Sequence, residues 1–163
     1  MGNILLITII CLYTMRLTDI TFKTIYKKRD IIYNKILKNK PDINRSYAKK
    51  LANIIDIKSI KYNIDPIQYT AMLAQESQYR LEAVNTTTGD YGISQINYRT
   101  AAAYGLDIAR LISDLEYSVE AGLIVLFDFK KRYAYKETDY WSRYNSSNRT
   151  KRDTYKKSVE GYI

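Results

Sequence analysis

Glu76 is the residue of this 163-residue sequence whose type and spacing best fit acid–base chemistry. Helical periodicity places its carboxyl group on the same stripe as Tyr69, Met72 and Leu73. Apolar surroundings disfavour the charged form of a carboxyl group, so they raise its pKa toward the value that a general acid needs near neutral pH. A glutamate at the edge of the stripe, with its carboxylate in solvent, is the competing interpretation, and position alone does not separate the two.

The residue types that are missing exclude several other chemistries. The sequence contains no histidine, which rules out histidine triads, histidine proton shuttles and histidine-ligated zinc. The single cysteine, Cys11, lies in an apolar run, so the chain has neither a disulfide framework nor a cysteine metal cluster. We expect Cys11 to be a small buried hydrophobic residue. Acid–base chemistry therefore falls to carboxylates, lysines, tyrosines or this one thiol.

Helices must position Glu76, because helical periods dominate the sequence and no alternating run is long enough to build a sheet. Asp65 and Pro66 predict a helix start, with Asp65 as N-cap and Pro66 at the first helical position. The length and the composition, with 46% hydrophobic and 26% charged residues, fit one globular domain. We expect an all-helical domain with its main helices and turns at about 46–62, 65–77, 100–104, 113–133 and 139–144, followed by a last basic helix that contains Tyr155 and Val159.

An irregular loop at 86–97 follows the helix that carries Glu76. Gly89 and Gly92 within it suit backbone positions with positive φ or close approach. Such loops often carry function on a rigid helical scaffold. Gly122 lies inside the long helix expected over 113–133, where glycine costs about 1 kcal/mol relative to alanine. We therefore expect another backbone to pack closely against Gly122.

The net charge of +9 is concentrated in residues 1–62, and residues 63–163 sum to zero. This distribution suits a polyanionic partner: nucleic acid, an anionic lipid surface or an acidic cell-wall polymer. The apolar run at 4–15 would span roughly 18 Å as a helix, less than the roughly 30 Å of a bilayer core, which favours an export signal. A buried N-terminal helix is the alternative. We expect a signal peptide or membrane anchor over 1–16, a basic helical linker over 17–43 and the main domain over 44–163.

Four short blocks of the sequence resemble the lytic transglycosylase family, the lysozyme-like enzymes that cleave bacterial peptidoglycan. The blocks occur in the family's order and separation and cover roughly residues 47–160: Gln75-Glu76-Ser77, Gly92-Ile93-Ser94-Gln95-Ile96-Asn97, Tyr144-Asn145, and Tyr155 with Val159. The resemblance implies a lysozyme-like helical fold with a substrate groove. The Gln-Ile-Asn ending of the second block is similar to small members that accompany secretion systems, conjugation machines and phage entry.

The resemblance assigns roles to individual residues. Glu76 becomes the sole catalytic acid and base, with Ser77 beside it. Gln95 lines the sugar groove, and Tyr144 helps to position the Glu76 carboxyl group. The remaining substrate-binding residues that the resemblance implies are Asn145, Tyr91 and Ile93. Two departures from the family pattern concern the shape of the groove: Ser94 stands where the family often has methionine, and Ser147 where it often has glycine.

The resemblance also implies a mechanism. Glu76 protonates the oxygen leaving the MurNAc anomeric carbon, and the C6 hydroxyl of the same sugar then closes on that carbon to give a 1,6-anhydro end, with no metal or organic cofactor. Two alternatives stay open: a hydrolase in which Asp90 supplies a second carboxylate, and a non-enzymatic basic module that binds nucleic acid or the cell wall.

The same resemblance indicates where the protein acts and what it meets there. It implies peptidoglycan glycan strands as partner, with nucleic acid disfavoured because the basic residues show no recognised nucleic-acid-binding pattern. It further implies a secretion, conjugation or virion assembly as a larger partner. Separately, the apolar run and the basic residues that follow it suggest membrane contact through the N-terminus. We expect export to the periplasm or cell envelope, or a place in a virion.

Overall fold

The computed structural model describes residues 28–163. The signal peptide or anchor expected over 1–16, including Cys11, lies outside the described residues, as does the first part of the linker expected over 17–43. Residues 28–39 form a helix that leads into the rest of the chain. Within residues 28–163, every helix is too short or too polar to cross a membrane.

The chain folds into the predicted all-helical single domain, with one small sheet. After the helix at 28–39, the helices are α2 (Arg45–Tyr62), α3 (Pro66–Ser77), α4 (Tyr98–Ala103), α5 (Ile108–Ser113), α6 (Leu115–Tyr133), the 3-10 helix η1 (Tyr140–Tyr144) and α7 (Arg149–Glu160). The strands are β1 (Val84–Asn85), β2 (Asp90–Tyr91) and β3 (Ile96–Asn97), antiparallel and in the order β1-β2-β3. The sheet and α5 were not predicted from the sequence.

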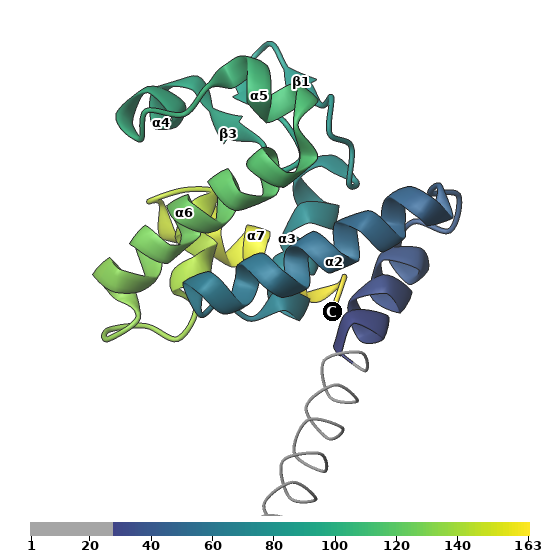
Figure 1. Cartoon of the computed structure of the whole chain (residues 1–163). Helices are drawn as coiled ribbons and strands as arrows, with labels where there is room; N and C mark the ends of the chain where they lie inside the picture. The colour runs from purple at the N-terminus through teal and green to yellow at the C-terminus, as the bar shows by residue number, and fades with distance from the viewer. Residues whose placement is uncertain (1–27) are drawn as a thin grey trace, which may run out of the picture.

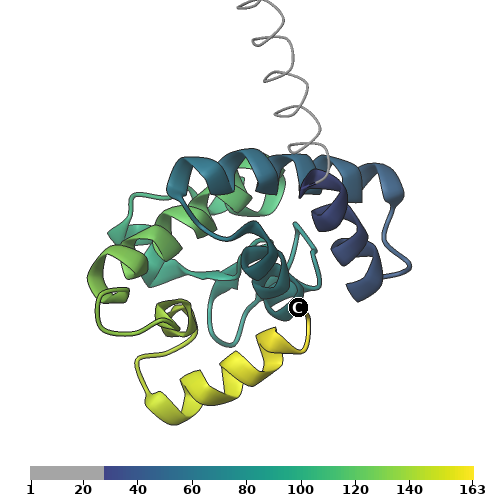
Figure 2. The same cartoon turned by 90° about the horizontal axis from the view of Figure 1, so that it is seen from below.

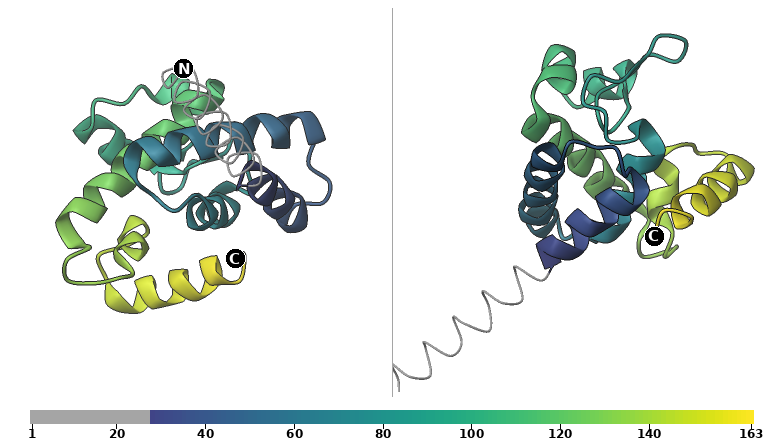
Figure 3. Two further views of the ribbon diagram at one scale, coloured as in Figure 1. Left: turned by 60° about the horizontal axis from the view of Figure 1, so that its bottom comes forward. Right: turned by 90° about the vertical axis from the view of Figure 1, so that its right-hand side faces the viewer.

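Two lobes share the long helix α6 (Figure 1). The strands, α4 and α5 form the upper lobe, and α2, α3 and α7 form the body below it. Helix α3 lies in the middle of the body, with α2 and α7 on opposite sides of it (Figures 2 and 3). Helix α6 packs along α2 and contacts α5 and η1, while α7 packs on α3. The C-terminal end of α3, whose last turn contains Glu76, therefore lies between the two lobes.

The junction between α2 and α3 follows its local sequence closely. Asn63 ends α2 in the left-handed conformation at φ 50°, and its N–H donates to carbonyl groups of the last turn. The Asp65 carboxylate accepts from the N–H of Ile67 at 2.9 Å, and Pro66 occupies the first turn of α3. These features confirm the predicted end of one helix and start of the next, and they fix the direction in which α3 carries Glu76.

The helix at 28–39 belongs to the same hydrophobic core as the body. Ile32 and Ile36 are completely buried in the core cluster that also contains Leu51 and Ile55 of α2. The described part of the segment expected as a linker thus packs as a helix of the domain, because Ile32 and Ile36 lie four residues apart on one face of that helix.

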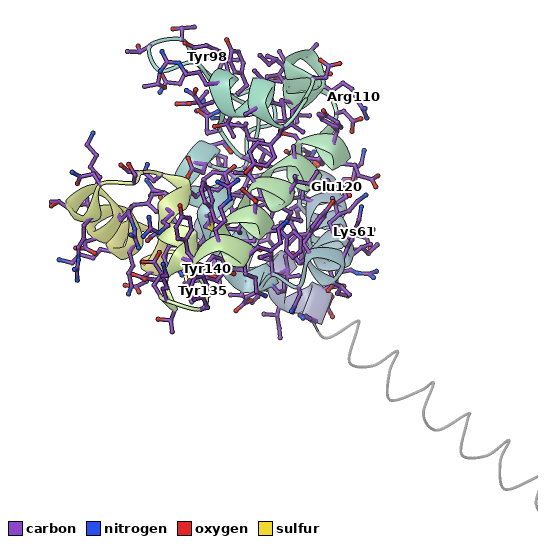
Figure 4. All side chains as sticks on the ribbon, turned by 90° about the vertical axis from the view of Figure 1, so that its left-hand side faces the viewer. Lys61, Tyr98, Arg110, Glu120, Tyr135 and Tyr140 are labelled. Carbon is purple, nitrogen blue, oxygen red and sulfur yellow. The ribbon has the colours of Figure 1, made fainter. Side chains whose placement is uncertain are left out.

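Gly122 is where α6 approaches the other elements most closely. A Cβ atom at this position would overlap with the hydroxyl oxygens of Tyr69 and Ser94. The expectation of a close approach was right, but its partner was wrong: the neighbours are side chains of α3 and of the loop before β3, not another backbone. Helix α6 also contacts α2, where Lys58 and Lys61 pair with Glu120; Figure 4 labels Lys61 and Glu120.

Candidate active site

Glu76 lies in the last turn of α3, where α7 packs against it. Its side chain is half-buried, and the hydroxyl of Tyr155 donates a 2.6 Å hydrogen bond to Oε1. The other oxygen, Oε2, makes no hydrogen bond with residues 28–163. One oxygen of the carboxyl group is therefore held in place, and the other is available to an incoming molecule.

The surroundings of Glu76 raise its pKa from 4.5 to about 7. Burial is the largest cause, because it penalises the charged carboxylate. The hydrogen bond from Tyr155 opposes it by stabilising the carboxylate, and the negative charge of Asp90 raises the pKa further. Glu76 is thus close to half protonated near neutral pH, the condition under which one group can first give and then take a proton.

A groove of about 810 Å³ contains the Glu76 side chain. The upper lobe contributes Asp90, Gln95 and Arg99, and the opposite wall comes from the end of η1, the segment after it and the first turn of α7. Because the groove is open and lined largely by polar side chains, it suits an extended polar molecule rather than a small apolar one. The residues of the second wall are Tyr144, Asn145, Ser146, Ser147 and Lys151.

Asp90 shares this groove, but both of its oxygens already accept hydrogen bonds. Oδ1 accepts from the side-chain amide of Asn97 at 2.9 Å, and Oδ2 accepts from the hydroxyl of Thr88. These bonds hold the Asp90 side chain between β3 and the turn that precedes β2. Asp90 therefore acts on Glu76 mainly as a fixed negative charge.

The structure brings Gln95, Tyr144 and Asn145 into the groove with Glu76. Gln95 adopts φ 46°, and its side-chain amide donates to the carbonyl oxygens of Gly92 and Ala83 at 2.9 and 3.1 Å. The side-chain N–H groups of Gln95 thus hold the loop in place. The side-chain carbonyl oxygen of Gln95 is the polar atom that remains for a ligand.

Tyr144 does not hold Glu76 directly. Its hydroxyl donates to the carbonyl oxygen of Ser94 at 2.8 Å, so it fastens the loop to η1. Tyr155 of α7, and not Tyr144, makes the hydrogen bond to the Glu76 carboxyl group. That Tyr144 helps to position this carboxyl group stays a prediction.

Three other predicted site residues lie outside the groove lining. Ser77 is buried, and its hydroxyl donates to the carbonyl oxygen of Ile93 at 2.7 Å. Ile93 is completely buried, and Tyr91 packs against the small core of the upper lobe. Ser77 and Ile93 together tie the end of α3 to the loop, so the structure gives them a supporting place beside Glu76.

Sequence reasoning gave no role to several residues that the structure places around Glu76 or in the groove. Tyr155 was noted only as part of a motif, although its spacing with Arg152 and Val159 marks one buried face of α7. Arg99 and Lys151 add two positive charges to the groove walls. Within residues 28–163, no group of three or more acidic or cysteine side chains is arranged to hold a metal ion.

Comparison with known proteins gives one match. A family model described as Transglycosylase SLT domain matches residues 53–161, a range that includes Glu76, the loop, Tyr144 and Tyr155. The match confirms the resemblance predicted from the sequence blocks and fits the helical fold. Searches of curated proteins and of solved structures found no match.

Proposed function

The chain belongs to the transglycosylase SLT domain family, and from this premise we propose that Glu76 alone carries out lytic cleavage of peptidoglycan. Membership of the family implies a glycan-cleaving enzyme with lytic transglycosylase activity on peptidoglycan. The proposal adds the bond that is cut, the product that forms and the residues that act.

The observation that carries the proposal is the state of Glu76. Its pKa of about 7, its open oxygen Oε2 and its position in a polar groove are the properties that a group alternating between acid and base requires. Burial and the charge of Asp90 keep a large fraction protonated, while Tyr155 keeps the carboxyl group in one orientation.

The proposed reaction cuts the β-1,4 bond between MurNAc and GlcNAc. Glu76 gives its proton to the glycosidic oxygen as the bond to the MurNAc C1 breaks, and the acetamido group of that sugar stabilises the positive charge at C1. The Glu76 carboxylate then takes the proton from the C6 hydroxyl of the same MurNAc. The C6 oxygen bonds to C1, which gives a 1,6-anhydro end and returns Glu76 to its protonated form.

A hydrolase that uses Asp90 is the second candidate function. Asp90 lines the same groove, and in hydrolytic glycosidases a second carboxylate activates water or attacks C1. The hydrogen bonds from Asn97 and Thr88 to both Asp90 oxygens favour the single-carboxylate reaction, because a base needs a lone pair directed at the water.

Matched isosteric variants separate the two reactions. On purified peptidoglycan, we expect Glu76→Gln to lose turbidity clearance by at least about a thousandfold, because no other group can protonate the leaving oxygen. Asp90→Asn keeps the hydrogen-bond geometry of a side-chain oxygen and should retain activity within about tenfold. Clearance by Glu76→Gln at the wild-type rate would refute the role of Glu76, and complete loss in Asp90→Asn would favour the hydrolase.

We also propose that the protein works outside the cytoplasm, in the periplasm or cell envelope or as part of a virion. The support is the substrate, because peptidoglycan lies in that compartment. A secretion, conjugation or phage-entry assembly fits such a small glycan-cleaving protein as its larger partner. Fractionation of producing cells tests the location: recovery of the full-length chain with the cytosol alone would contradict it.

A further inference from the structure

A second hollow of about 350 Å³ adjoins the groove on the α7 side. Asn145 and Lys151 line both spaces, so the hollow continues the groove at this point. Tyr155 lines the hollow while its hydroxyl holds Glu76. A molecule bound in the groove therefore has access to a side chamber directly beside the reacting group.

The walls of this side chamber are polar. Thr150 and Thr154 of α7 lie on one wall, and the hydroxyl of Ser158 donates to the side-chain oxygen of Gln75 on the other. This bond joins α7 to α3 and gives the chamber a fixed base. Hydroxyl and amide groups of this kind suit the N–H and C=O groups of a peptide.

Lys151 is the charged residue of the chamber, and its charge is not neutralised within the described chain. Its side chain is exposed and makes no ion pair or hydrogen bond with residues 28–163. Its neighbours on the same helix differ: Arg152 pairs with Glu137 at 2.7 Å, and Lys156 pairs with Asp139 at 3.5 Å. An unpaired cation at the junction of two binding spaces favours a ligand with a negative charge at that point.

We propose that the side chamber binds the stem peptide attached to the lactyl group of muramic acid, with Lys151 paired to a carboxylate of that peptide. The inference rests on the proposed peptidoglycan-cleaving function and adds a preference for strands that still carry peptides. The sugar rings themselves are neutral, so they offer Lys151 no counter-charge. The peptide carries free carboxylates together with the backbone groups that the chamber walls can bind.

The test compares two substrates and two charge-changing variants. Glycan strands with intact peptides are compared with strands from which an amidase has removed the peptides and whose exposed lactyl carboxylates have been converted to neutral amides, and kcat/KM is measured for each. Lys157 is the matched control, because it is exposed on the same helix and lines neither space.

We expect the wild type to prefer the peptide-bearing strands. Lys151→Gln should lower kcat/KM on those strands about threefold and Lys151→Glu about tenfold, as for loss and reversal of an exposed ion pair. Both losses should be clearly smaller on stripped strands, where Lys151 still lines the groove but meets no peptide carboxylate, and Lys157→Glu should alter neither rate. Equal losses on both substrates would assign Lys151 to the glycan, and no loss on either would leave the chamber without this ligand; both results overturn the proposal.

A binding measurement keeps this inference separate from the function on which it rests. In the Glu76→Gln background, the dissociation constant of a soluble peptide-bearing muramyl disaccharide is measured by titration with and without Lys151→Glu. Weaker binding with Lys151→Glu supports the chamber even if the wild type cleaves nothing, a result that would refute only the proposed reaction. Unchanged binding alongside Glu76-dependent cleavage overturns the chamber and leaves the reaction standing.

Discussion

Replacing Tyr155 with phenylalanine removes the one hydrogen bond that Glu76 receives from the described chain while leaving the ring in the core. Burial and the Glu76 charge hold the pKa of Tyr155 well above 10, so its hydroxyl donates throughout the working pH range. A hydrogen bond to a charged group contributes about 1.5–3 kcal/mol, and one pKa unit corresponds to about 1.4 kcal/mol. We therefore expect Tyr155→Phe to raise the pKa of Glu76 from about 7 to about 8 or 9.

The assay is the pH dependence of kcat/KM on peptidoglycan, which reports the free enzyme. The reaction needs protonated Glu76, so the rate falls as pH rises through the pKa of this group. In Tyr155→Phe, the alkaline limb of the profile should move to higher pH by about one to two pH units. The maximal rate should drop because the carboxyl group is less well oriented.

Tyr144→Phe is the matched control, because the Tyr144 hydroxyl bonds to the Ser94 carbonyl oxygen instead of Glu76. Its alkaline limb should stay where the wild type has it. An alkaline limb that stays in place or moves to lower pH in Tyr155→Phe would refute the reasoning about how the Glu76 proton is held.

Three further substitutions test how the fold supports the site. Because the pKa of Glu76 rises from 4.5 to about 7 on folding, the folded state binds more protons and loses stability as pH rises between these values. Glu76→Gln should therefore raise the free energy of unfolding, measured with urea, by up to about 3 kcal/mol at pH 8 and by little at pH 4. Gly122→Ala should lower the free energy of unfolding by about 2 kcal/mol, because its methyl group meets the Tyr69 hydroxyl; a stabilised variant would contradict this packing. Arg152→Met should cost about 3 kcal/mol, because buried Arg152 pairs with Glu137; unfolding at the wild-type urea midpoint would show that the pair contributes nothing.

The parts of the fold that the sequence predicted are those with local causes. Asn63, Asp65 and Pro66 define the α2–α3 junction within a single short stretch of chain, residues 63–66, so capping rules were sufficient. The sheet was missed because its strands have two residues each, and pairings such as Asp90 with Asn97 depend on how the loop folds. Helix α5 had a local signal that was overlooked, since Asp107 caps it through the N–H groups of the first turn.

The candidate site divides in the same way. The position of Glu76 on an apolar stripe follows from helical spacing alone, and its raised pKa was expected on that basis. The hydrogen bond from Tyr155 was not foreseen, because the two residues are 79 positions apart and meet only when α7 packs on α3. The hydrogen bond from Tyr144 to the Ser94 carbonyl oxygen was not foreseen either, since a tyrosine's motif position does not reveal whether its hydroxyl reaches a side chain or a carbonyl group.

The central claim is that the C6 hydroxyl of the substrate, and not water, attacks C1 under the control of Glu76. Digestion of purified peptidoglycan in water enriched in oxygen-18, followed by mass spectrometry of the released fragments, tests this directly. The single-carboxylate reaction predicts MurNAc ends that are lighter by one water than a hydrolysed end and that contain no label at C1. Fragments with reducing ends that acquire oxygen-18 during cleavage would contradict it.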